Sequence, residues 1–119
     1  MPRSLALYLL DLRDASGEIL MFTEGMGRSD YEGNLLVRRA VERDFIIIGD
    51  AIAQMRIHHP DSMKHIEESQ KIVAFRNVLV HEYSTVDNDD VWSAITSKLP
   101  RFREQILAVV ATLDLGTLS

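Results

Sequence analysis

Apolar residues recur every three or four positions along most of the chain, which is the spacing of one buried face of an α-helix. The first such segment runs over about residues 3–23 and is ended by Gly25 and Gly27. Its apolar face comprises Leu5, Leu9, Leu12, Ala15, Ile19 and Phe22. The strict apolar–polar alternation of a strand is not sustained anywhere in the sequence. The pattern therefore predicts helices and gives little support for strands.

A second helix is expected from Tyr31 or Asn34 to Ile57. Taken in isolation, the apolar run 45–48 fits a buried strand, but helical spacing on both sides of it favours a helix that is buried on more than one face. Gly49 lies inside this helix, where a glycine costs up to about 1 kcal/mol relative to alanine. We interpret Gly49 as a place where another backbone segment packs closely.

Further helical segments complete the chain. A short helix is expected over residues 62–68, and a third long helix begins near Lys71. We expect the last helical region to begin at the acidic run 87–90, because carboxylates there can cap the free N–H groups of the first turn and offset the helix dipole. Pro100 should kink this region or split it into two helices. We predict one all-α domain over residues 1–119, an up-and-down bundle of four to five helices.

Composition narrows the classes of function. The 119 residues include no cysteine, which excludes thiol catalysis, disulfides and cysteine-based zinc sites. The formal charge of −5 argues against a broad face for nucleic acid but permits a small site for one phosphate. The apolar run 5–10 is too short for a secretory signal or a membrane span. We expect a soluble, cytoplasmic protein with no cofactor and no membrane or DNA partner.

Residues 75–83 concentrate side chains that are suited to phosphate chemistry. Arg76 offers a permanent forked charge that binds phosphate and stabilises a pentacoordinate transition state. His81 can move a proton near neutral pH, and Asn77 could orient the imidazole or a phosphate oxygen. RNA supplies its own nucleophile, the 2′-hydroxyl, so the set is sufficient for RNA cleavage without a metal. Residue types alone also fit a solvated helix end at which His81 offsets the dipole.

Spacing constrains how these residues can act together. On a helix, Asn77 and His81 share a face, and Arg76 and Tyr83 lie about 20° from one another. Arg76 and His81 are about 140° apart on a straight helix. They serve one phosphate only if the helix ends near His81, or if a second subunit supplies one of them.

Histidines elsewhere do not form a convincing metal site. His58 and His59 are adjacent and so point to different sides of a helix, and His65 adds no carboxylate or fourth ligand at helical spacing. We predict that the protein binds no metal.

The chain resembles a known family at these residues. Residues 76–83 match the R-x4-H-x-Y motif of HEPN-domain proteins of the HepT type. The similarity extends in order through segments 22–26, 43–51 and 91–100, which covers nearly the whole chain. Two positions depart from the family: Ala74, where members often have glycine, and Asp50, where many have glutamate. The second departure leaves the role of that carboxylate open.

The resemblance implies a homodimeric HEPN-like helical domain that acts as the ribonuclease toxin of a type II toxin–antitoxin system. Arg76 and His81 would be the catalytic pair of a metal-independent endoribonuclease, supported by Asn77 in a cleft across the twofold axis. Tyr83 would receive AMP from a cognate MntA-type minimal nucleotidyltransferase antitoxin, and the added phosphate and bulk would exclude RNA.

Two other interpretations remain open at this point. One is a non-catalytic helical dimer that docks onto a small nucleotidyltransferase and binds a nucleotide phosphate through Arg76 and His81. The other is a dimer with structural duties alone, which becomes credible if the polar groups of the motif lie on separate surfaces.

Overall fold

The structure, a computed structural model, describes residues 3–113 except for the side chain of Tyr83. Every regular element in that part of the chain is helical, which confirms the predicted all-α class. The elements are α1 Leu5–Phe22, α2 Arg28–Glu32, α3 Leu35–His58, a 3-10 helix Pro60–His65, α4 Ser69–His81, a 3-10 helix Tyr83–Thr85, α5 Asn88–Ser93, a π-helical segment Ala94–Lys98 and α6 Leu99–Ala111. None of these helices is long and apolar enough to cross a membrane.

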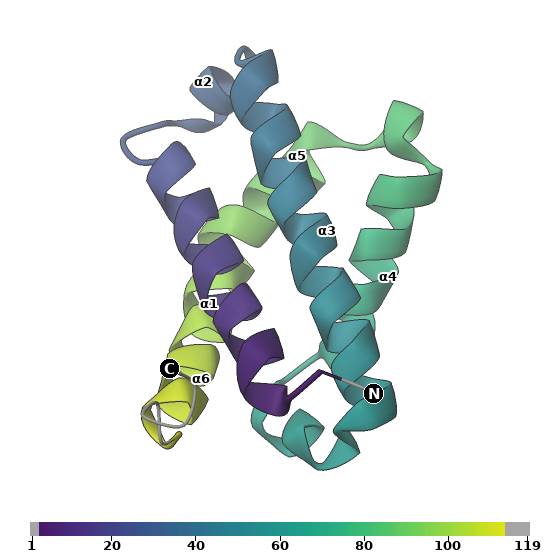
Figure 1. Cartoon of the computed structure of the whole chain (residues 1–119). Helices are drawn as coiled ribbons and strands as arrows, with labels where there is room; N and C mark the ends of the chain where they lie inside the picture. Colours follow the sequence, from purple (N-terminus) through teal and green to yellow (C-terminus); the bar gives the residue numbers. More distant parts are fainter. Residues whose placement is uncertain (1–2, 114–119) are drawn as a thin grey trace.

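The long helix α3 is the centre of the bundle (Figure 1). It packs against α1 on one side and α4 on another, and α6 packs against α1. Fully buried side chains from α1, α3, α5 and α6 form one core that includes Leu9, Leu12, Ile19, Val41, Ile52, Met55, Val91 and Ile106. Within α4, by contrast, Leu79 alone is buried. The helix that carries the candidate chemistry therefore keeps much of its surface accessible.

The segment before α3 holds a short helix that the sequence pattern did not reveal. Of the two predicted starts of the second helix, Asn34 is confirmed and Tyr31 is wrong. Asn34 caps α3, because its Oδ1 accepts a hydrogen bond from the backbone N–H of Val37 at 3.0 Å. Tyr31 belongs to the separate helix α2, where its ring is fully buried and lies 5.6 Å from the ring of Trp92. Burial against α5 stabilises a helix too short to form alone.

The C-terminal helical region begins and divides as its sequence predicts. Asp87 caps α5, with its Oδ1 accepting a hydrogen bond from the N–H of Asp89 at 2.8 Å. Pro100 lies in the first turn of α6, where its missing N–H leaves no helical hydrogen bond unmade. The π-helical segment Ala94–Lys98 joins the two helices, so the predicted split is confirmed without an intervening loop.

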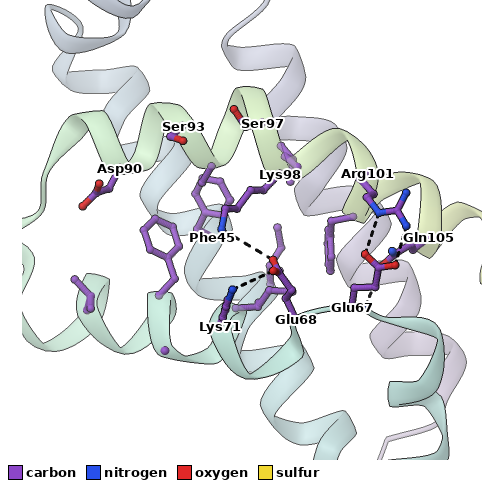
Figure 2. A pocket seen from close by; sticks show the side chains of 18 residues that line it. Phe45, Glu67, Glu68, Lys71, Asp90, Ser93, Ser97, Lys98, Arg101 and Gln105 are labelled. Atoms are coloured by element: carbon purple, nitrogen blue, oxygen red, sulfur yellow. Dashed lines mark hydrogen bonds and ion pairs between the residues drawn. The ribbon is translucent and has the colours of Figure 1, made fainter.

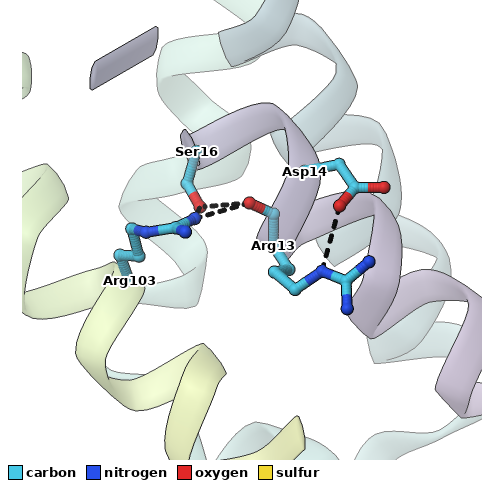
Figure 3. Close-up of polar contacts among 4 residues, drawn as sticks. All are labelled: Arg13, Asp14, Ser16 and Arg103. Carbon is cyan, nitrogen blue, oxygen red and sulfur yellow. Dashed lines mark hydrogen bonds and ion pairs between the residues drawn. The ribbon is translucent and has the colours of Figure 1, made fainter. Parts of the chain in front are cut away.

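Arg103 fastens α6 to α1. Its Nη1 donates to the carbonyl oxygen of Arg13 at 2.6 Å and to Oγ of Ser16 at 2.9 Å (Figure 3). Gly17 leaves room for the guanidinium, since a Cβ there would lie 3.0 Å from the same nitrogen. The charge of Arg103 is thus used in packing two helices together.

Asp44 on α3 is a buried carboxyl group, 4% exposed, and its Oδ2 has no hydrogen-bond partner within the described part of the chain. Burial raises the pKa of Asp44 to about 7, and the neighbouring carboxyl group of Glu18 adds to the rise while Arg43 opposes it. The folded protein therefore favours the protonated form of this side chain at a pH where the unfolded chain has lost the proton.

We therefore expect the free energy of unfolding to decrease as the pH rises. Between about pH 4 and about pH 7 the folded state binds more protons than the unfolded state at Asp44, so the slope of stability against pH is negative there. Denaturant titrations should show a loss of about 1–3 kcal/mol from pH 5 to pH 7 that Asp44→Asn lacks. An identical pH dependence of unfolding in the two proteins would contradict this assignment.

Candidate active site

Helix α4 carries three of the four residues that the sequence singled out. Arg76 and Asn77 lie in its second half, and His81 is its last residue. The backbone of Tyr83 lies in the following 3-10 helix, while its side chain is outside the described part of the structure. The motif thus spans the end of a helix.

The stem of Arg76 lies directly against the backbone of α3 at Gly49. A Cβ atom added at Gly49 would lie 2.2 Å from Cβ of Arg76 and 2.6 Å from its Cγ. Such separations are far below van der Waals contact, so only glycine permits α4 to approach here. The close approach predicted at Gly49 is confirmed, but the nearest atoms belong to the stem of the candidate catalytic arginine, and the nearest backbone atom, the carbonyl oxygen of Ile72, would lie 3.5 Å from the added Cβ.

Two polar neighbours hold the guanidinium of Arg76. Its Nε donates to Oδ1 of Asp50 at 2.6 Å, and its Nη1 donates to Oδ1 of Asn77 at 2.8 Å. The Arg76 side chain remains 29% exposed and that of Asp50 50% exposed. The sequence analysis left the role of Asp50 open and noted it only as the aspartate at a position where many proteins of the HepT type have glutamate. The structure brings Arg76, Asn77 and Asp50 together.

His81 does not join this group within one chain. It is exposed at the C-terminus of α4, where a protonated imidazole offsets the negative end of the helix dipole. No hydrogen bond links it to Arg76, Asn77 or Asp50 in residues 3–113. Because Arg76 and His81 lie five positions apart on one helix, they project about 140° from one another. Although α4 ends at His81, this does not bring the side chains of Arg76 and His81 together within one chain.

A cavity of about 760 Å³ lies on another side of α4, between that helix and the α5–α6 region (Figure 2). The residues that line it include Phe45, Phe75 and Phe102. Two ion pairs also line it, Glu67 with Arg101 at 2.7 Å and Glu68 with Lys71 at 3.1 Å. Arg76, Asn77 and His81 do not line this cavity. The candidate site is therefore on the exposed surface around Arg76.

Among the residues that the structure describes, no group of three or more His, Asp or Glu side chains is placed to hold a metal ion. His59 has a different use: its Nε2 lies 2.8 Å from the carbonyl oxygen of Arg3, and its ring packs edge-on against that of Tyr8. This histidine ties the start of the chain to the end of α3.

Comparisons with known proteins find relatives over most of the chain. The family model described as "Ribonuclease HepT-like" matches residues 12–109. Three proteins of Methanocaldococcus jannaschii are similar to this chain. "Putative RNase MJ1380" is 22% identical over 104 residues, which are 87% of this chain and 94% of the relative. "Putative RNase MJ1216" is 22% identical over 112 residues (94% and 92%), and "Putative RNase MJ0125" is 23% identical over 112 residues (94% and 96%). No solved structure matches the chain.

The contact at Gly49 leads to a stability prediction. Gly49→Ala should destabilise the protein by about 1–3 kcal/mol, because the added methyl group forces α4 away from α3. Gly33→Ala is the matched control, since a Cβ there meets no atom closer than 3.4 Å. Denaturant titration of both variants makes the measurement. Equal stability of the two variants would contradict the close approach of Arg76.

Proposed function

The chain belongs to the HepT-like ribonuclease family, and we propose that it is a metal-independent endoribonuclease that acts through Arg76 and His81. The family match and the relatives named as RNases support a ribonuclease. The observation that carries the residue assignment is the restrained guanidinium of Arg76, whose stem lies on Gly49 and whose head is held by Asp50 and Asn77.

The proposed reaction uses the nucleophile that RNA itself supplies. The 2′-oxygen attacks the adjacent phosphorus, the bond from phosphorus to the 5′-oxygen breaks, and a 2′,3′-cyclic phosphate and a 5′-hydroxyl result. The imidazole of His81 either accepts the proton of the 2′-hydroxyl or donates a proton to the leaving 5′-oxygen. The guanidinium of Arg76 stabilises the extra negative charge of the pentacoordinate transition state. Neither proton transfer needs a metal.

We propose a homodimer as the form that completes the site. Because Arg76 and His81 diverge on one helix, a twofold pairing is required to place Arg76 beside the partner subunit's His81. The exposure of α4 supports such a pairing. Val80, three positions after Asn77, is 38% exposed, and an apolar side chain next to the polar motif suits a contact with a second copy.

The proposed biological role is that of a toxin in a type II toxin–antitoxin system. The support is the motif itself, which continues from His81 to Tyr83 as in proteins of the HepT type. A cognate MntA-type nucleotidyltransferase would transfer AMP to Tyr83. Each AMP adds a negative phosphate and bulk close to the residues that bind RNA, so modification should exclude the substrate.

Cleavage of RNA in the presence of EDTA is the first test of this function. Arg76→Ala and His81→Ala should each lower the rate at least about 100-fold, because each removes a group that acts in the transition state. Arg56→Ala and His58→Ala are matched controls, exposed at the far end of α3, and should retain activity. Thermal unfolding of all four variants checks the fold.

Other outcomes of the same assay separate the alternatives. A mixture of Arg76→Ala and His81→Ala should cleave faster than either variant alone, because a mixed dimer unites one intact Arg76 with one intact His81. No recovery would contradict a site shared between subunits. A wild-type protein that binds nucleotide but leaves tRNA and mRNA intact would favour the non-catalytic module.

Mass spectrometry tests the proposed regulation. After co-expression with the cognate nucleotidyltransferase, the peptide that contains Tyr83 should gain one or more AMP units, and the modified protein should lose RNA cleavage. Tyr83→Phe should gain no mass and should remain active. Tyr31 is an internal control because it is fully buried. Modification at another tyrosine, or none, would contradict the assignment to Tyr83.

A further inference from the structure

Two consecutive residues of α3 determine both ends of the Arg76 side chain. Gly49 admits the stem of Arg76, and Asp50, the next residue, accepts the hydrogen bond from its Nε at 2.6 Å. Asn77 then accepts a hydrogen bond from Nη1 at 2.8 Å. The stem and head of one long side chain are therefore both restrained, although Asp50 and Arg76 lie 26 positions apart in the sequence.

These two hydrogen bonds leave most of the guanidinium free. A guanidinium has five N–H donors, of which Asp50 takes the single one on Nε and Asn77 one of the two on Nη1. Within the part of the chain that the structure describes, both N–H groups of Nη2 and one of Nη1 have no hydrogen-bond partner, and this end of the fork is suited to phosphate oxygens. From this geometry we infer that Asp50 is a positioning residue: it turns the guanidinium so that its free end faces the scissile phosphate of RNA.

The ion pair between Glu67 and Arg101 differs in geometry from the contact between Asp50 and Arg76. Glu67 binds Arg101 through both carboxylate oxygens, with Nε at 2.9 Å and Nη2 at 2.7 Å. That bidentate pair occupies a whole side of the Arg101 guanidinium and joins the start of α6 to the turn before α4. Asp50 contacts Arg76 through one oxygen at Nε, which restrains the head without covering its end.

The exposure of the pair indicates that the fold does not depend on it. Asp50 is 50% exposed and Arg76 29% exposed, and ion pairs of this kind contribute little to stability. A free arginine, however, samples many rotamers, and each productive encounter with RNA would have to select one of them. Holding the head in advance raises the fraction of bound complexes that can react. The inference rests on the proposed ribonuclease function and adds a residue of α3 to a site otherwise built from α4.

The test is cleavage of a short RNA by wild type, Asp50→Ala and Asp50→Asn. Asp50→Ala should lower kcat about 10- to 100-fold, with a smaller change in KM, because orientation is needed most in the transition state. Asp50→Asn keeps an oxygen that can accept from Nε and should lie between Asp50→Ala and wild type. Glu67→Ala removes another arginine–carboxylate pair, one that lies away from Arg76 and is more exposed, and should leave kcat unchanged.

A second readout does not depend on catalysis. In 15N-edited NMR spectra, the Nε–H signal of Arg76 should be observable and protected from exchange in the wild type, and Asp50→Ala should remove that protection. The thermal unfolding midpoints of the two proteins should agree closely. Retained protection in Asp50→Ala would overturn the inference, and so would unchanged kcat in an active enzyme.

The proposed function and the inference fail in different ways. A wild type that leaves RNA intact refutes the proposed cleavage and, with it, the positioning role of Asp50. A wild type that cleaves RNA beside a fully active Asp50→Ala refutes the inference alone. If Asp50→Ala unfolds at the assay temperature to an extent that accounts for its loss of kcat, the role of Asp50 is structural, and that result would also overturn the inference.

Discussion

The contact of Gly49 with the stem of Arg76 is the constraint on which the candidate site depends. Helices α3 and α4 approach so closely there that any Cβ at Gly49 would overlap the Cβ of Arg76. Because a packed core does not deform continuously, this approach also sets the height and rotation of α4 on α3. The rotation in turn decides that Asp50 meets Nε of Arg76 and that Asn77 meets Nη1.

Within residues 3–113 a glycine packs against an arginine side chain at two places, with different results. At Gly17, the guanidinium of Arg103 lies over the helix and donates to the carbonyl oxygen of Arg13, so its charge is used between α6 and α1 (Figure 3). At Gly49, the stem of Arg76 takes the space, and the head extends beyond the contact to a half-exposed carboxylate. What differs is whether the head or the stem meets the glycine, and only the second arrangement leaves a cation accessible to a ligand.

The helical character of the chain was predictable because it depends on near neighbours. The apolar spacing in α1 and α3 and the caps at Asn34 and Asp87 involve residues within one or two turns, and the structure confirms them. The short helix α2 was missed for the converse reason. Its stability comes from Tyr31, which is buried against Trp92 more than 60 positions away in the sequence, and no local pattern records that contact.

For the candidate site, the sequence alone determined which residue types are present, that Arg76 and His81 diverge on one helix, and that Gly49 needs a close neighbour. Those statements follow from chemistry and from the rise and turn of a helix. The tertiary structure decided that the neighbour of Gly49 is Arg76 and that Asp50 holds its head. These residues lie on different helices, so their meeting depends on how α3 and α4 cross, which is a property of packing over the whole interface.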